Sequence, residues 1–259
     1  MKVALIQTVL SWESPENNFV RLDGVLKNLR RPDLVVLPEM FTTGFTMNTA
    51  KAEIFADDAP TIQWMKAWSK DLNAVITGSV AMSSPLGFHN RLLWVRPDGS
   101  FDFYDKKHTL RFAGEDKHYK SGGKRLIEHW KGFDCCPLIC YDLRFPVWSR
   151  NGWSHGKPDY DVLIYVANWP SARKEAWSTL IKARAIENQC YVLAVNRVGT
   201  DPNGNVYSGD SAIISPKGEV LWSQSDIAGV GEWELNLEEL KTFREKFPVL
   251  KDGDPFQWV

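Results

Sequence analysis

The sequence is poor in the features that mark secreted and membrane proteins. Only four of its 259 residues are cysteine, too few for the disulfide framework of a small secreted protein. It has no N-x-Ser/Thr acceptor, and Ser11 and Glu13 interrupt the N-terminal apolar run before it is long enough for a membrane span or a signal peptide. We therefore expect a cytoplasmic protein with reduced thiols and no membrane partner.

The chain also lacks an excess of charge of either sign. Its 31 Lys and Arg residues balance 32 Asp and Glu residues, which leaves a net charge of −1. Binding to a phosphate backbone requires a positive surface, so we expect no nucleic-acid partner. No linker, repeat or low-complexity segment divides the chain. We expect residues 1–259 to form a single domain, with residues from about 245 as a C-terminal tail.

Common signatures of cofactor and metal sites are missing as well. There is no G-x-G-x-x-G, P-loop, H-E-x-x-H or G-x-S-x-G motif, and the five histidines lack metal-ligand spacing. Cys135, Cys136 and Cys140 are close in sequence, but neighbouring residues of a strand point to opposite faces, so these thiols cannot converge well on one ion. We expect no metal and no cofactor.

The chain does contain strand patterns that alternate with helix patterns. Several expected strands are continuous apolar runs, which are typical of strands covered on both faces. Pro97-Asp98-Gly99 and Pro216-Lys217-Gly218 predict hairpin turns. The expected strands are Lys2–Gln7, Asp33–Leu37, Ala74–Ala81, Arg91–Arg96, Phe101–Tyr104, Arg125–Trp130, Cys135–Cys140, Asp161–Ala167, Tyr191–Asn196, Ser211–Ile214, Glu219–Trp222 and Gly229–Leu235. The expected helices run from Pro15 to about Leu29, from Thr61 to Leu72 and from Arg173 to Gln189. This alternation predicts an α/β fold in which helices cover a core of two sheets.

Three of the apolar runs end abruptly in polar residues. In VVLPE the apolar run ends at Glu39, and in PLICYD it ends at Cys140. In IYVANWP the first polar residue after the apolar run is Asn168. Ligands of α/β sheets bind at the carboxyl ends of the strands, so a carboxylate, a thiol and an amide at such ends form a plausible pocket floor. Glu39 needs a nearby cation because an unpaired buried carboxylate is costly. Lys106 and Lys107, at the end of another expected strand, offer one.

These strand ends resemble the three catalytic blocks of the nitrilase superfamily of carbon–nitrogen hydrolases. The matching segments are LPEMF (37–41), YDKKH (104–108) and CYDLRFP (140–146), in the order and spacing of the family. ANWP (167–170) and RAIEN (184–188) are similar to its later motifs. The resemblance covers nearly the whole chain and is closest to the small ω-amidase branch. It implies a four-layer αββα sandwich.

The resemblance also implies a Glu-Lys-Cys triad of Glu39, Lys106 and Cys140. The lysine of the family lies two residues before the histidine of YDKKH, which selects Lys106 over Lys107. Glu115 matches a second glutamate of the family, and it would orient Lys106 and the substrate nitrogen. In this chemistry Glu39 takes the thiol proton of Cys140 and later delivers it to departing ammonia, without a metal or an organic cofactor.

The ω-amidase branch implies small dicarboxylate mono-amides as substrates, such as 2-oxoglutaramate and 2-oxosuccinamate. They would be hydrolysed to the acid and ammonia through a thioester on Cys140. The backbone N–H of Tyr141 would help to bind the oxyanion. We expect Asn168, Trp169 and Arg173 to contact the substrate. Arg173, near the start of a helix, would bind its carboxylate, and Trp169 would limit its length.

Other residues near these motifs have structural interpretations. Asp142 and Arg144 are expected to pair with each other and to shape the turn that carries Cys140. Arg184 and Glu187, three residues apart, are expected to form an ion pair on the long helix. Packing is the expected role of the remaining thiols, those of Cys135, Cys136 and Cys190.

Alternatives remain open at this point. Within the superfamily they are a deaminated-glutathione amidase, an N-carbamoyl amidase and a nitrilase. From other classes they are a catalytically silent binding protein on the same scaffold, which the intact triad argues against, and a metal-dependent hydrolase using Glu39, Asp142 and nearby histidines. The resemblance further implies a homodimer. The C-terminal tail would then cross to the partner or wrap its own subunit.

Overall fold

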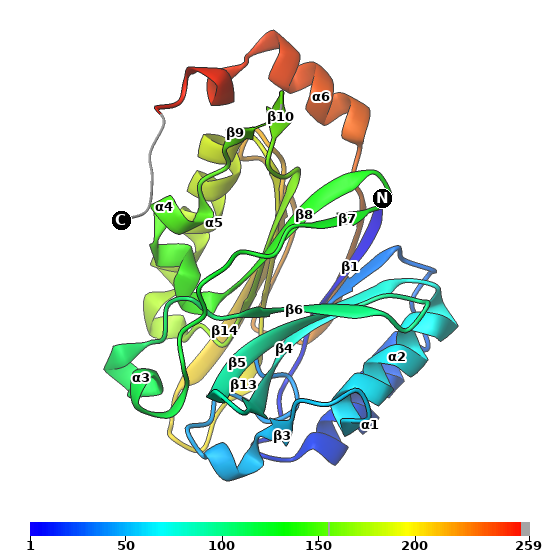
Figure 1. Cartoon of the computed structure of the whole chain (residues 1–259), viewed down its shortest axis with the longest axis vertical. Coiled ribbons are helices and arrows are strands. Elements are labelled where there is room, and N and C mark those ends of the chain that lie inside the picture. The colour runs from blue at the N-terminus through cyan, green and yellow to red at the C-terminus, as the bar shows by residue number, and fades with distance from the viewer. Residues whose placement is uncertain (155, 255–259) are drawn as a thin grey trace.

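Two seven-stranded sheets packed face to face form the centre of the computed structural model, which describes residues 1–154 and 156–254 (Figure 1). The order of the first sheet is β16-β1-β2-β4-β5-β6, with β3 on β4; that of the second is β13-β14-β12-β11-β8-β7, with β15 on β14. The first sheet comprises β1 (Lys2–Gln7), β2 (Leu34–Val36), β3 (Glu53–Ile54), β4 (Val75–Ser84), β5 (Gly87–Val95), β6 (Phe101–Asp105) and β16 (Gly229–Glu234). The second comprises β7 (Glu128–Trp130), β8 (Phe133–Ile139), β11 (Val162–Ala167), β12 (Tyr191–Asn196), β13 (Val198–Thr200), β14 (Val206–Ile214) and β15 (Val220–Ser225). A separate ribbon pairs β9 (Trp153–Ser154) with β10 (Lys157–Pro158).

Parallel strands occupy the middle of both sheets. β1, β2 and β4 are parallel in the first sheet, and β8, β11 and β12 are parallel in the second. Parallel strands have their carboxyl ends at one edge of a sheet, where ligand sites form in α/β proteins. The continuous apolar sequences of these strands suit their position, because both of their faces are covered.

Successive side chains of β1 point alternately into the two apolar cores on either side of the first sheet. Val3 and Leu5 point between the sheets and join the core that contains the apolar residues of β8, β11 and β12. Ala4 and Ile6 point to the other face and pack in the second core, beneath the helices. The period of two along a strand thus gives each sheet two apolar faces, which need a cover on both sides.

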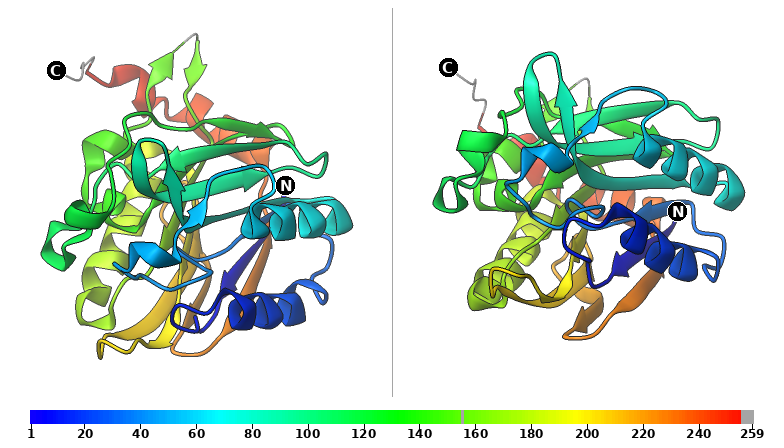
Figure 2. Two further views of the ribbon diagram at one scale, coloured as in Figure 1. Left: turned by 60° about the horizontal axis from the view of Figure 1, so that its bottom comes forward. Right: turned by 90° about the horizontal axis from the view of Figure 1, so that it is seen from below.

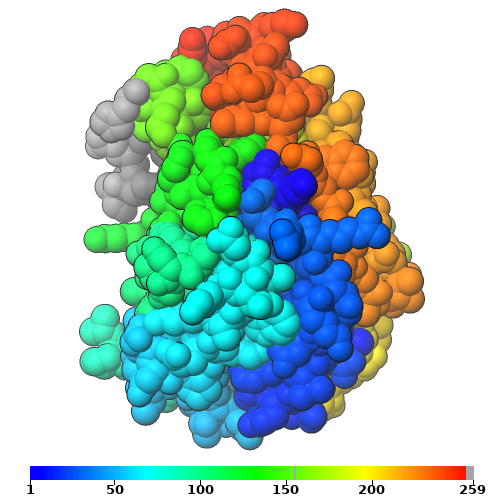
Figure 3. All heavy atoms as spheres, turned by 90° about the vertical axis from the view of Figure 1, so that its right-hand side faces the viewer, coloured from blue at the N-terminus to red at the C-terminus, as the bar shows by residue number. Residues whose placement is uncertain are grey.

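Helices provide that cover on the two outer faces. α1 (Pro15–Leu26) and α2 (Pro60–Leu72) bury Leu22, Ile62 and Met65 against the first sheet. α5 (Lys174–Asn188) lies on the second sheet through Trp177, Ile181 and Ala185, preceded along the chain by the short α4 (Pro146–Ser149). Figure 2 shows the two pairs of helices on opposite sides of the sheets, and Figure 3 views the face covered by α1 and α2, in blue and cyan. The arrangement is αββα and confirms the predicted fold.

The expected strands and both expected hairpins are present, with shifts at some boundaries. The turns at 97–99 and 216–218 join β5 to β6 and β14 to β15. The largest shift is in β14, which begins at Val206 rather than Ser211. Its first half, VYSGD, is not an apolar run, and it contains a register shift at Asp210, where φ is +55°. Short strands β3, β9, β10 and β13 were not predicted because two or three residues carry no periodic signal.

A helix that the sequence analysis missed precedes the expected tail. α6 (Leu237–Lys246) starts at Asn236, whose side chain accepts hydrogen bonds from the N–H groups of Glu238 and Glu239. Arg244 on α6 is buried and donates to Asp161 Oδ1 at 2.5 Å and to the carbonyls of Gln189 and Tyr160 at 2.8 and 2.9 Å. The described part of this region therefore packs on its own chain. Residues 255–259 of the expected tail lie outside the described residues.

The structural interpretations of three cysteines and one ion pair are confirmed. Cys135, Cys136 and Cys190 are fully buried free thiols in the central core. On α5, Arg184 Nη1 lies 2.9 Å from Glu187 Oε1. The same arginine donates from Nη2 to the carbonyl of Leu143 at 2.6 Å, so it also links α5 to the turn after β8.

Candidate active site

Four strand ends from the two sheets meet at one edge of the sandwich. Glu39 follows β2, Lys106 follows β6, Cys140 follows β8 and Asn168 follows β11. Glu39 and Lys106 thus come from the first sheet, and Cys140 and Asn168 from the second. The loop at 37–41 lies close against β4 because Gly78 has no side chain; a Cβ there would come within 2.8 Å of Leu37 Cβ. The structure therefore brings together the three strand ends that the sequence analysis selected, together with Lys106.

A buried cluster of one ammonium and two carboxylates occupies this edge. Lys106 Nζ lies 2.8 Å from Glu39 Oε1, and 3.0 and 2.9 Å from the two oxygens of Glu115. All three side chains are at most 1% exposed. Burial alone lowers the pKa of Lys106, but the charges of Glu115 and Glu39 outweigh it and raise the pKa of the ammonium above its usual value. The cation that Glu39 requires is therefore present and remains charged.

Glu115 comes from the one-turn helix α3 (Glu115–His118). Its Oε2 accepts a hydrogen bond from the backbone N–H of Leu110 at 2.5 Å, which fixes the carboxylate toward Lys106. Burial raises the pKa of Glu115 above its ordinary value; Lys106 acts in the opposite direction, and Glu39 reinforces the increase. The position of Glu115 beside Lys106 is the one expected from the resemblance.

Asn90 belongs to the same cluster and was missed by the sequence analysis. It lies on β5, is fully buried, and donates from Nδ2 to Glu39 Oε1 at 2.8 Å and to Glu115 Oε1 at 3.2 Å. The amide thus holds the two carboxylates next to each other together with Lys106. Asn90 stands between His89 and Arg91, so it did not stand out as an interruption of an apolar run, and nothing in the sequence connects it to residues 51 and 25 positions away.

Cys140 begins the 3₁₀ turn at 140–144 with a left-handed backbone, φ +43°. Non-glycine residues adopt this conformation rarely, and it persists only where the surroundings hold it. The side chain is 6% exposed. Burial raises the pKa of the thiol well above its ordinary value, Glu39 raises it further by charge and by a hydrogen bond, and Lys106 counteracts them. The thiol therefore keeps its proton, with Glu39 in position to accept it.

Asp142 holds this turn, but not through Arg144. Its Oδ2 accepts from the Tyr104 hydroxyl at 2.7 Å and from the N–H of Ile139 at 3.0 Å, while Oδ1 accepts from the N–H of His108 at 3.0 Å. The expected Asp142–Arg144 pair is wrong. The backbone turns sharply after Cys140, so Asp142 points into the protein and Arg144 points outward, where its guanidinium carbon lies 4.8 Å from the centre of the Trp169 ring.

A pocket of about 460 Å³ opens above Cys140. It is lined by Leu110, Phe112, Cys140, Tyr141, Arg144, Asn168, Trp169, Pro170 and Arg173. The four residues expected to contact the substrate, Tyr141, Asn168, Trp169 and Arg173, are among them. Arg144 is an addition that the sequence analysis assigned to a structural pair. Within residues 1–154 and 156–254, neither arginine of the pocket forms an ion pair, so both are available to an anionic ligand.

Asn168 is anchored directly on Glu39. Its backbone N–H donates to Glu39 Oε2 at 2.8 Å, and its Nδ2 donates to the Glu39 carbonyl at 2.6 Å. Trp169, the next residue, donates from its backbone N–H to Asn196 Oδ1 and from Nε1 to the Arg173 carbonyl, both at 2.8 Å. The segment after β11 therefore links two residues of the pocket wall, Asn168 and Trp169, to the carboxylate of Glu39.

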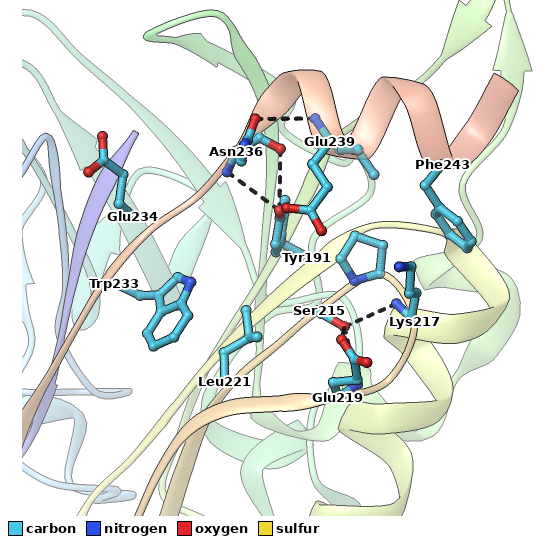
Figure 4. A pocket seen from close by; sticks show the side chains of 12 residues that line it. Tyr191, Ser215, Lys217, Glu219, Leu221, Trp233, Glu234, Asn236, Glu239 and Phe243 are labelled. Carbon is cyan, nitrogen blue, oxygen red and sulfur yellow. Dashed lines mark hydrogen bonds between the residues drawn. The ribbon is translucent and has the colours of Figure 1, made fainter. Parts of the chain in front are cut away.

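A second hollow lies elsewhere, between the β14–β15 hairpin, β16 and α6 (Figure 4). Its volume is about 110 Å³, and several of its polar groups bond to one another, as Tyr191 does with Asn236 and Ser215 with Glu219. None of the candidate catalytic or substrate-binding residues lines it.

Two kinds of feature are absent from the described residues. No group of three or more His, Cys, Asp and Glu side chains there is placed to hold a metal ion. In the same part of the chain, no helix has both the length and the apolar character needed to cross a bilayer.

The chain is similar to known proteins over nearly its whole length. A family model described as carbon-nitrogen hydrolase matches residues 2–245. A Yersinia enterocolitica protein named omega-amidase YafV is 46% identical over 257 residues, which cover 99% of this chain and 98% of that protein. A Bacillus subtilis protein named 2-oxoglutaramate amidase is 31% identical over 253 residues, 96% of each chain. The crystal structure of XC1258 from Xanthomonas campestris, described as a CN-hydrolase superfamily protein with an arsenic adduct in its active site, is 42% identical with a TM-score of 0.97, and covers 100% of this chain and 99% of that one.

Proposed function

This chain belongs to the carbon–nitrogen hydrolase family, and on that basis we propose that it is an ω-amidase with Cys140 as its nucleophile. Its substrates are small dicarboxylate mono-amides, such as 2-oxoglutaramate and 2-oxosuccinamate, and its products are the dicarboxylic acid and ammonia. The observation that carries the proposal is the Glu39–Lys106–Glu115 cluster beneath a pocket lined by the Cys140 thiol and by two arginines that form no ion pair with the described residues.

In the first half of the reaction, Glu39 accepts the Cys140 proton as the sulfur attacks the amide carbon. The raised pKa of the thiol makes this transfer necessary, because little thiolate exists before substrate binds. Glu39 then returns the proton to the amide nitrogen, the C–N bond breaks and ammonia leaves. A thioester on Cys140 remains, and Glu39 is again a carboxylate.

Lys106 stabilises the negative charge that develops on the carbonyl oxygen, together with the backbone N–H of Tyr141. Its ammonium is kept charged by the two carboxylates and is already fixed in place, so little reorganisation is needed during the reaction. Glu115 acts as a positioning group for Lys106.

In the second half, water attacks the thioester carbon and gives a proton to Glu39. The carbon–sulfur bond breaks, and Glu39 returns the proton to the Cys140 sulfur. The acid product is released and the enzyme is restored. No step requires a group other than the substrate, water and these side chains.

The substrate class follows from the pocket and from the relatives. Arg144 lies over the ring of Trp169 and Arg173 over the ring of Phe112, and both line the pocket. Either can bind a carboxylate at the end of the substrate remote from its amide. The relatives named omega-amidase and 2-oxoglutaramate amidase match this chain over nearly their full length, which supports the same class here.

Ammonia release from a panel of compounds tests the proposal. We expect 2-oxoglutaramate and 2-oxosuccinamate to be hydrolysed faster than neutral amides of equal length, N-carbamoyl amino acids, nitriles and deaminated glutathione. The same rates are expected in the presence of a strong chelator. A preference for the neutral amide would contradict the substrate class, and loss of activity with the chelator would contradict the metal-free mechanism.

We further propose the domain organisation, the oligomeric state and the compartment of the enzyme. The chain is one catalytic domain that works as a homodimer in the cytoplasm. The nearly full-length match to bacterial relatives supports the single domain. Light scattering after gel filtration measures the stoichiometry.

A further inference from the structure

Asn168 has one buried polar atom that finds no partner among the described residues. Its N–H and its Nδ2 are both used in hydrogen bonds to Glu39, but its Oδ1 accepts no hydrogen bond from the described residues. The residue is 4% exposed and contributes to the wall of the Cys140 pocket. A buried carbonyl oxygen without a donor is costly and uncommon, so its retention in a pocket suggests that a ligand supplies the donor.

Asn196 shows what the same side chain does in a purely structural position. It is the last residue of the neighbouring strand β12, whereas Asn168 directly follows β11. Its Oδ1 accepts from the N–H groups of Trp169 and Arg197, and its Nδ2 donates to the carbonyls of Trp169 and Gly209. Its side-chain amide thus directs all of its hydrogen-bonding capacity at backbone groups. Asn168 uses only the donor half of its amide in this way.

We propose that Oδ1 of Asn168 accepts a hydrogen bond from the N–H of the substrate amide and so determines that the enzyme cleaves amides rather than esters. The proposal rests on the amidase function above and adds a specificity residue to it. The two bonds to Glu39 place Asn168 beside the carboxylate that protonates the leaving nitrogen. A nitrogen within reach of Glu39 is therefore also close to the amide of Asn168.

The chemistry of the leaving group gives this contact its effect on the rate. When the tetrahedral intermediate forms, the nitrogen directs its lone pair toward the proton donor Glu39, and its N–H bonds need acceptors elsewhere. As the proton arrives, positive charge develops on the nitrogen and the hydrogen bond to Oδ1 becomes stronger. A contact that is stronger in the transition state than in the bound substrate lowers the barrier to C–N cleavage. An ester oxygen has no N–H, so it gains nothing from Oδ1.

The experiment compares kcat/KM for an amide and for the methyl ester of the same acyl group. Both substrates form the same thioester, so their ratio isolates the step in which the leaving group departs. The substrate pair is 2-oxoglutaramate and the corresponding mono-methyl ester, assayed through release of ammonia and of methanol. The variants are Asn168→Ala, Asn168→Asp and, as the matched control, Asn196→Ala.

We expect Asn168→Ala to lower the amide-to-ester ratio by about ten- to a hundredfold, the effect of losing one hydrogen bond to a group that becomes charged. Asn168→Asp keeps an acceptor oxygen and should hold the ratio within about threefold of the wild type, even if both rates fall. Asn196→Ala should lower the two rates together. Equal losses on amide and ester in Asn168→Ala would show a structural role only and overturn the proposal.

If Asn168→Ala does not fold, the amide-to-ester ratio of Asn168→Asp still tests the proposal. A tenfold or larger drop in its amide-to-ester ratio would overturn the proposal, because its acceptor remains. Failure of the proposed function has a different signature. A wild-type enzyme that prefers another amide would refute the substrate class alone, and the same ratio would then be measured with that amide and its ester.

Discussion

Replacing Lys106 with methionine removes the ammonium that separates two buried carboxylates. The substitution keeps the length of the side chain, so packing changes little. Glu39 and Glu115, both fully buried, lose their cation, and Asn90 still bonds to both of them. We expect Lys106→Met to be inactive and also substantially less stable.

The size of the loss follows from the geometry. Lys106 Nζ makes three contacts of 2.8–3.0 Å with these carboxylates, and neither partner has access to water. Removing one partner of a buried ion pair costs about 3–5 kcal/mol. For a chain of this size, 1 kcal/mol changes Tm by about 2–4 °C, so Tm should fall by about 6–20 °C.

The loss should depend on pH in a defined direction. Burial already raises the pKa of Glu115 in the intact protein, and Lys106 opposes this increase. Without Lys106 the pKa rises further, so the folded variant holds a proton that the unfolded chain releases above its ordinary pKa of about 4.3. The free energy of unfolding of the variant therefore falls as pH rises from the pKa of Glu115 in the unfolded chain to its higher pKa in the folded variant. The difference in Tm between variant and wild type should be larger at pH 8 than at pH 5.

Thermal unfolding followed by circular dichroism at both pH values measures these effects. Lys107→Met is the matched control, because this neighbouring lysine lies over the Trp148 ring and outside the carboxylate cluster. The double variant Lys106→Met with Glu115→Gln also removes one of the two buried carboxylates. It should recover about half or more of the stability that Lys106→Met alone loses. A loss below about 1 kcal/mol, or one that is the same at pH 5 and pH 8, would refute the electrostatic account of the cluster.

Three further predictions concern the reaction itself. Cys140→Ala should abolish ammonia release with little change in Tm, whereas Cys190→Ala, at a core thiol away from the pocket, should leave turnover nearly intact. Hydroxylamine should intercept the thioester, so a hydroxamate should accumulate beside the acid, and mass spectrometry of a slow substrate should locate the acyl adduct on the peptide with Cys140. Arg144→Ala and Arg173→Ala should each weaken hydrolysis of an acidic ω-amide relative to a neutral amide of equal length, by roughly ten- to more than a hundredfold for the arginine that binds the carboxylate.

The outcomes that would contradict these predictions are distinct. Near-normal turnover in Cys140→Ala would remove it as the nucleophile. Absence of both hydroxamate and adduct would indicate direct attack by water. Equal losses on the acidic and neutral amides in both arginine variants would show that neither guanidinium binds the carboxylate.

The sequence alone determined the layers and the chemical groups of the site. Continuous apolar strands such as β11 require cover on both faces, and this local pattern was sufficient to predict sheets between helices. Glu39 and Cys140 stood out because each ends an apolar run, and the resemblance to the nitrilase superfamily then implied the triad and selected Lys106 over Lys107. Such signals depend on neighbours in the chain, which a sequence displays directly.

Only the tertiary structure decided which of these groups touch and which side chains complete the site. Asn90 could not be found because its partners Glu39 and Glu115 lie on other elements, and a hydrogen bond across a sheet leaves no trace in spacing. Asp142 and Arg144 were paired wrongly because residues two apart in a 3₁₀ turn point in different directions, so Asp142 is buried while Arg144 lines the pocket. The free oxygen of Asn168 depends on where Glu39 lies, at the end of a strand in the opposite sheet. Side-chain direction and satisfaction of hydrogen bonds are set by packing between layers, and that packing exists only once the two sheets meet.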